Sequence, residues 1–147
     1  MERMRMKGLS RLLLAAIVAG FCSVAAAQVP GLEPQTTSSG IRWISGGVGF
    51  DETFALQQME GGYNARLLFA VRGSGEYLSE VTVIIQNRQG QSVFEEIAYG
   101  PRLLAQLQPG GYTVTAESGG SVITRQISVP RTGATNVAFY FPDHPGR

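Results

Sequence analysis

The stretch that decides the fold is LLAQLQPGGYTVTAESGGSVITRQISV, residues 103–129 of the 147-residue chain. Apolar residues alternate with polar ones through it, and this period of two is typical of strands with one buried face. Pro109-Gly110-Gly111 and Gly119-Gly120 interrupt the alternation and supply residues that favour turns. The stretch therefore predicts three successive antiparallel strands joined by tight turns.

The same alternation continues on both sides of this stretch. Glycine and proline separate its segments at a spacing of roughly ten residues, with no helical crossover between them. The pattern predicts an all-β fold of about seven to eight strands, an antiparallel β-sandwich, with a small closed barrel as the alternative. Outside the quoted stretch, we expect strands over residues 41–45, 63–71, 81–86, 92–99 and 136–141. The first strand of the quoted stretch itself begins one residue earlier, at residue 102.

One short helix is expected near the start of the domain. Asp51 is a candidate N-cap, and Glu52 would favour the positive end of a helix dipole. Residues 53–60 then carry apolar side chains at helical spacing, and Gly61-Gly62 would end the helix.

The N-terminus has the pattern of an export signal. Four basic residues precede an apolar run over residues 12–24, and Ala25-Ala26-Ala27 predicts cleavage after Ala27. We therefore expect a signal peptide over 1–27 and a periplasmic or secreted protein, with no membrane span after cleavage. The alternatives are a retained membrane anchor and lipidation at Cys22. Lipidation needs a small residue directly before the cysteine, and this chain has Phe21 there.

Cleavage would leave 120 residues, enough for one domain with its own core. This part has eight arginines, no lysine, no cysteine and 10 acidic residues, so its net charge is −2. Such a balance gives no reason to expect nucleic acid as a partner, and a disulfide is excluded. Residues 28–40 are rich in Pro, Gly, Ser and Thr and predict a disordered linker, 41–141 the β-sandwich domain, and 142–147 a loose tail.

Two segments carry a resemblance to a known family. VTVIIQNRQG (residues 81–90) followed by LLAQLQPGGYTVTA (103–116) resembles the carboxypeptidase regulatory-like domains, which have a transthyretin-like or prealbumin-like Greek-key sandwich. Their pattern L-x-x-L-x-P-G-x-Y-x-V-x-A is matched from Leu104 to Ala116. In that pattern Pro109-Gly110 would form a turn, with Tyr112 packed over it.

A wider resemblance covers residues 46–141. The series GGVGFDE, YNARLLFA, SGEYL and YGP is similar to a group of small exported proteobacterial proteins that carry the same regulatory-like domain. The resemblance implies a free-standing periplasmic domain and no particular reaction.

The motifs of common active sites are missing from the sequence. The single histidine, His144, cannot by itself form a metal site or a triad. Glu95 and Glu96 would point to opposite faces of a strand, and Gly46-Gly47-Val48-Gly49 lacks the lysine of a phosphate loop. We therefore expect no catalytic residues, no cofactor and no metal site.

Loop residues are the remaining candidates for binding, because loops on a sandwich are where binding residues collect. Asp51 and Glu52 form one acidic pair, although helix capping explains them better. Glu76 and Tyr77 lie in the loop segment SGEYL and need not be required for packing. These four residues are the sequence-based binding candidates.

The sequence thus predicts an exported, non-catalytic β-sandwich module. It would bind a protein or glycan partner or play a structural role in the cell envelope. One alternative is a small periplasmic hydrolase that uses Asp51, Glu52 and Glu76, which requires two carboxylates in one cleft. The other is an assembly subunit that pairs through an exposed sheet edge.

Overall fold

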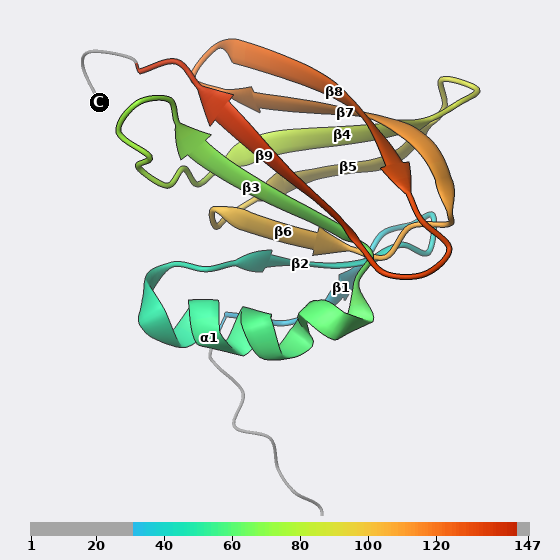
Figure 1. The fold of residues 1–147 in the computed structure, drawn as a ribbon, viewed down its shortest axis with the longest axis horizontal. Coiled ribbons are helices and arrows are strands. Elements are labelled where there is room, and N and C mark those ends of the chain that lie inside the picture. The colour runs from blue at the N-terminus through green and yellow to red at the C-terminus, as the bar shows by residue number, and fades with distance from the viewer. Residues whose placement is uncertain (1–30, 144–147) are drawn as a thin grey trace, which may run out of the picture.

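The computed structural model describes residues 31–143, which form nine strands in two sheets and one α-helix. Figure 1 shows the sheets facing each other, with the helix on the outer side of one of them. The all-β sandwich expected from the sequence is therefore confirmed. The predicted signal peptide, Cys22 and His144 lie outside the described residues.

Each sheet takes strands from both halves of the domain. The five-stranded sheet has the order β1 (Gln35–Thr36), β2 (Arg42–Gly46), β6 (Arg102–Ala105), β3 (Ala65–Val71), β9 (Thr135–Phe141). The four-stranded sheet has the order β5 (Ser92–Ala98), β4 (Val81–Asn87), β7 (Gly110–Ser118), β8 (Ser121–Val129).

One strand pair departs from the antiparallel arrangement expected from the sequence. β9 pairs with β3 in parallel, from Ala65 opposite Thr135 to Val71 opposite Phe141. The reason is the route of the chain, because β8 in one sheet is followed by β9 in the other, and β9 then runs in the same direction as β3 (Figure 1).

The buried faces of the two sheets form one core. Val81, Val83 and Ile85 of β4 are completely buried, as the alternation predicts. Trp43 of β2 meets Phe94 of β5 edge to face, with ring centroids 5.4 Å apart, so the two sheets interlock through aromatic side chains. Burial of a large apolar side chain contributes roughly 2–3 kcal/mol, and the described chain holds no cysteine to add a covalent link.

The three strands predicted in residues 103–129 do not all belong to one sheet. β7 and β8 form the expected hairpin, with Gly119 and Gly120 at φ of 56° and 80°. β6, however, lies in the other sheet, so Pro109-Gly110 marks a crossing between sheets and not a hairpin turn. The Tyr112 hydroxyl donates to the Gln108 carbonyl at 2.6 Å and fixes this crossing, as in a tyrosine corner.

The helix starts earlier than the sequence predicts. α1 covers Gly49–Met59 and continues as a 3₁₀ turn, η1 (Glu60–Gly62), and its N-cap is Val48, so the prediction of Asp51 as N-cap is wrong. Gly47 and Gly49 have φ of 96° and 78°, and this left-handed backbone turns the chain into the helix before Asp51. The buried Leu56 then packs against the outer side of the five-stranded sheet.

Residues 31–40 lie against the sandwich, whereas the sequence predicts a disordered linker over 28–40. Leu32 is only 5% exposed and joins Leu56 in the cluster beneath the helix. β1 adds a short strand to β2, and a turn follows in which the Thr37 amide donates to the Ile41 carbonyl at 2.9 Å. The buried Leu32, the pairing of β1 and the hydrogen bonds of the turn together hold this segment against the sandwich.

Candidate functional site

Asp51 and Glu52 both lie in the first turn of α1, but only Glu52 makes structural contacts. Its Oε2 accepts hydrogen bonds from the amides of Gly47 and Val48, each at 3.0 Å. Val48 is the N-cap, so its amide is among those that a helix N-terminus leaves without an intrahelical partner, and Gly47 is the residue just before it. Asp51 is exposed. The carboxylate of Glu52 is thus used to hold the start of the helix.

Glu76 and Tyr77 lie in the loop between β3 and β4. The Val71 amide donates to the Glu76 carbonyl at 2.7 Å, which folds the loop back onto the end of β3. The Glu76 side chain lines a pocket of about 110 Å³ beside Phe141 and Asp143, and this pocket is lined by neither Asp51 nor Glu52. Tyr77 is 60% exposed and forms an isolated antiparallel bridge with Ala70.

The bridge places Tyr77 on the outer face of the five-stranded sheet. Along β3, Leu67 and Phe69 belong to the core, so Arg66, Leu68 and Ala70 face outward. Residues paired across strands share a face, and the pairing of β3 with both neighbours therefore gives three outward rows. The rows are Leu104–Arg66–Asn136, Arg102–Leu68–Ala138 and Tyr77–Ala70–Tyr140.

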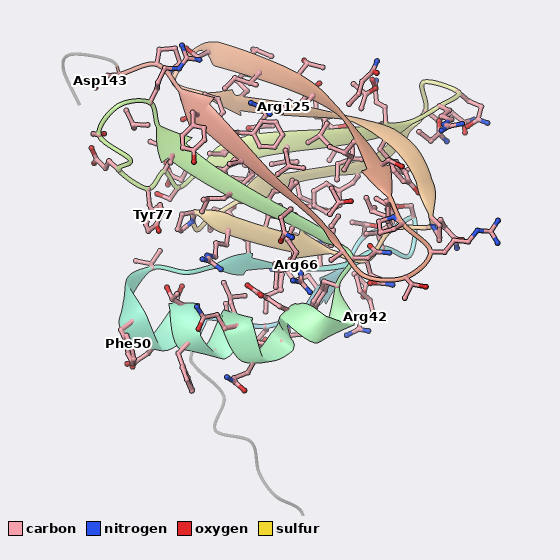
Figure 2. All side chains as sticks on the ribbon, viewed as in Figure 1. Arg42, Phe50, Arg66, Tyr77, Arg125 and Asp143 are labelled. Carbon is pink, nitrogen blue, oxygen red and sulfur yellow. The ribbon has the colours of Figure 1, made fainter. Side chains whose placement is uncertain are left out.

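A groove of about 240 Å³ lies over the first two of these rows. We call it the outer-face groove. The helix covers the β2 side of the sheet (Figure 1). Leu56 packs there on Ile44 and Leu104, and Glu60 of η1 lines the groove. The lining residues are Glu60, Arg66, Leu67, Leu68, Arg102, Leu104, Asn136, Val137 and Ala138. Figure 2 shows Arg66 near the middle of the molecule and Tyr77 at the end of β3.

Two arginines in the groove share one acidic partner. Arg102 Nη1 lies 3.0 Å from Glu60 Oε1, and Arg66 Nη1 lies 3.6 Å from Glu60 Oε2. Arg66 Nη2 also donates to the Glu60 backbone carbonyl at 2.9 Å. Two guanidinium groups and one carboxylate leave a net charge of +1 at this point. The three side chains are 26–29% exposed, so solvent and ligands can reach them.

One donor of this cluster is buried without a partner. Arg66 Nε has no hydrogen-bond partner among the described residues, although it is inaccessible to solvent. An unpaired buried donor costs about 1–3 kcal/mol, so it is an unusual feature that calls for an explanation. Arginine also carries several N–H donors in a rigid fork, and most of those of Arg66 and Arg102 remain available.

A second exposed feature lies on α1. The rings of Phe50 and Phe54 stack with their centroids 6.2 Å apart, and they are 81% and 54% exposed. They point away from the sheet, whereas Leu56 points towards it. Exposed aromatic pairs of this kind often mark a contact with another molecule.

Sequence reasoning named Tyr77 as a binding candidate, which stays a prediction, and it did not predict the groove. Alternation does place Arg66, Leu68 and Ala70 on one face of a strand. What brings Arg102 and Asn136 beside Arg66 is the position of β3 between β6 and β9, which no local pattern reveals. The sequence does hold one signal. Each of these strands carries a polar or charged residue on its outward face, at a position that alternates with core residues.

The described residues, 31–143, contain no group of three or more His, Cys, Asp or Glu side chains placed to hold a metal ion. Within the same range there is also no helix with the length and apolar character needed to cross a membrane. No family model matches the chain, and none of the curated proteins matches it, so its function has to be inferred from its own surface chemistry.

Proposed function

We propose that the protein is an exported, non-catalytic β-sandwich module that binds a protein or glycan partner in the cell envelope through the outer-face groove. The observation that carries this proposal is the pair Arg66 and Arg102, whose unused N–H donors line a groove of about 240 Å³. Arginine is enriched at binding sites because its planar fork gives directed, charge-assisted hydrogen bonds. Export follows from the signal pattern of residues 1–27.

The proposal includes membership of the carboxypeptidase regulatory-like, prealbumin-like domains. It is supported by the pattern from Leu104 to Ala116, in which Tyr112 bonds back to Gln108 beside Pro109-Gly110. A regulatory-like domain that stands alone would engage its partner in trans. An accessible groove on one sheet face is suited to that role.

Catalysis by the loop carboxylates receives less support. A carboxylate pair in hydrolysis must be free to exchange protons and must face one cleft. The carboxylate of Glu52 is bound to two backbone amides, and Glu76 lines a different pocket. Glu60 is the acidic residue in the groove, and it is paired with two arginines.

Assembly through a sheet edge also receives less support. In the four-stranded sheet, both edge strands carry a charged residue on the face that packs inward. Glu96 of β5 lies opposite the buried Val83, and Arg125 of β8 lies opposite the buried Val114. Inward-pointing charges are a known protection against edge-to-edge pairing.

The proposal is tested by blocking the groove without changing its charge. The full-length gene is expressed, and the exported protein is immobilised and exposed to an envelope extract containing proteins and glycans. Ala138→Trp fills the groove from β9, and Thr124→Trp places the same ring on the outer face of the other sheet. We expect wild type and Thr124→Trp to retain the same partner and Ala138→Trp to lose it.

Two outcomes would overturn the assignment. Retention of the partner by a folded Ala138→Trp variant would exclude the groove as the contact, and absence of any retained partner would remove the binding role. A third variant, Phe50→Ser with Phe54→Ser, tests the exposed rings of α1. Loss of the partner in this variant alone would move the contact from the groove to the helix.

A further inference from the structure

We infer that the outer-face groove binds a ligand carboxylate, held by the guanidinium groups of Arg66 and Arg102. The inference rests on the proposed function, because it names the ligand class of the same groove. It starts from the charge balance, since two guanidinium groups share only Glu60 and carry a net charge of +1. An anion entering the groove would restore neutrality.

The contacts of Glu60 show which anion fits. Its carboxylate places Oε1 against Arg102 at 3.0 Å and Oε2 against Arg66 at a longer 3.6 Å, so it spans both arginines without satisfying Arg66. A planar carboxylate is therefore already recognised at this point, and a second one would meet the remaining donors. A monoanion matches the charge of +1, whereas a phosphate dianion would exceed it.

The buried Nε of Arg66 adds direction to the site. It is the donor of the cluster that finds no partner among residues 31–143, and Arg66 lines the groove. Nε and one Nη of a guanidinium form the side of the fork that binds a carboxylate with two parallel hydrogen bonds. Nη2 of Arg66 is partly used by the Glu60 carbonyl, and Nε is inaccessible to solvent, so the Arg66 side chain has to move before a ligand carboxylate can meet Nε.

The two exposed tyrosines of the outer face lie outside this site. Tyr77 and Tyr140 flank Ala70, which is only 2% exposed. Ala70 is four residues along β3 from Arg66, a distance of roughly 14 Å. None of these three residues lines the groove, so the carboxylate is the part of the ligand that the groove recognises.

The shared chemistry is thus a carboxylate, which either an acidic sugar of a glycan or a free aromatic acid provides. Four probes separate the possibilities: glucuronate, glucose, phenylacetate and inorganic phosphate. Glucose has the sugar ring without the carboxylate. Binding is measured by NMR on the exported protein labelled with ¹⁵N-arginine, through the Nε–Hε signals of Arg66 and Arg102.

We expect glucuronate to shift the Nε–Hε signals of Arg66 and Arg102 and to bind at least about tenfold more tightly than glucose or phosphate. A glycan source predicts that glucuronate binds more tightly than phenylacetate, and a free aromatic acid predicts the reverse order. Equal binding of glucose and glucuronate, or tighter binding of phosphate, would overturn the carboxylate assignment.

Conservative variants test the two arginines. Arg66→Lys and Arg102→Lys keep the charge but lose the fork, so each should weaken glucuronate binding about tenfold. Arg88→Lys, in the hairpin between β4 and β5, is the matched control and should bind like wild type. Glu60→Gln removes the competing carboxylate and should tighten binding several-fold, whereas a purely structural role of Glu60 predicts weaker binding.

The two proposals can fail separately. If Ala138→Trp abolishes partner retention but no carboxylate shifts the arginine signals, the groove is the contact and the carboxylate assignment is wrong. If glucuronate binds at Arg66 and Arg102 but Ala138→Trp still retains the partner, the anion site stands and the proposed function of the groove is wrong.

Discussion

Asn64 holds both backbone groups of Leu107. Its Oδ1 accepts a hydrogen bond from the Leu107 amide at 2.8 Å, and its Nδ2 donates to the Leu107 carbonyl at 2.6 Å. The Asn64 carbonyl also accepts from the Thr135 amide at 2.8 Å. One buried residue before β3 therefore fixes the segment that crosses from β6 to β7 and the start of β9.

The first prediction concerns this contact. Asn64→Ala leaves the amide and carbonyl of the buried Leu107 without partners, so it should lower the free energy of unfolding by about 2–3 kcal/mol. The free energy is obtained from urea unfolding followed by the fluorescence of the buried Trp43. Asn136→Ala, an exposed position in β9, is the matched control and should change stability by less than ~0.5 kcal/mol. Equal stability of the two variants would contradict the role of Asn64.

Asn64 also shows where sequence reasoning stops. The strands follow from alternation, which correctly places Val83 and Val114 in the core, because a period of two is a local property of the chain. The partner of Asn64 lies 43 residues further on, and the crossing at Pro109-Gly110 looks like a hairpin turn in the sequence. Local patterns cannot tell a turn within a sheet from a passage between sheets.

The groove could be predicted only in part, for the same reason. The outward face of β3, with Arg66 and Ala70, is visible in the sequence. Leu104 and Asn136 flank Arg66, and Arg102 lies in the next row beside Leu68, because β3 pairs with β6 on one side and with β9 on the other, a long-range choice made by the packing of both sheets. Tyr77 was a sequence-based candidate as a loop aromatic, and its bridge to Ala70 places it beside this face.

The second prediction separates the two acidic residues of the first helical turn. Glu52→Ala removes the hydrogen bonds to the amides of Gly47 and Val48 and should cost about 1–2 kcal/mol. Asp51→Ala removes an exposed charge that only the helix dipole favours, so about 0.5 kcal/mol or less should be lost. Urea unfolding of both variants gives the comparison. A larger loss for Asp51→Ala would mean that Asp51, and not Glu52, stabilises the helix start.

The third prediction compares two glycines that have close neighbours. A methyl group on Gly100 would lie against the backbone of Gly46, which cannot move without shifting β2. A methyl group on Gly111 would meet the end of the flexible Arg88 side chain instead. Gly100→Ala should therefore cost roughly 2–4 kcal/mol and Gly111→Ala less than about 1 kcal/mol. Thermal unfolding monitored by circular dichroism ranks the two, and a reversed order would contradict the close approach at Gly100.

The fourth prediction concerns the edge of the four-stranded sheet. Arg125 of β8 lies over the ring of Phe139, 6.0 Å from its centroid, and its charge sits on the inward face of an edge strand. Arg125→Val keeps this face apolar and should stabilise the monomer or leave it unchanged, but it removes the charge that opposes pairing with a second edge.

The expected result is a higher dimer fraction for Arg125→Val than for wild type in sedimentation velocity at matched concentrations. Gln126→Val is the control, because Gln126 pairs with Thr113 on the outer face and should leave the dimer fraction nearly unchanged. Equal association of the two variants would show that general surface hydrophobicity, and not the inward charge of Arg125, controls pairing at this edge. The test thus connects the cation–π contact between Arg125 and Phe139 with the absence of edge assembly that the binding proposal assumes.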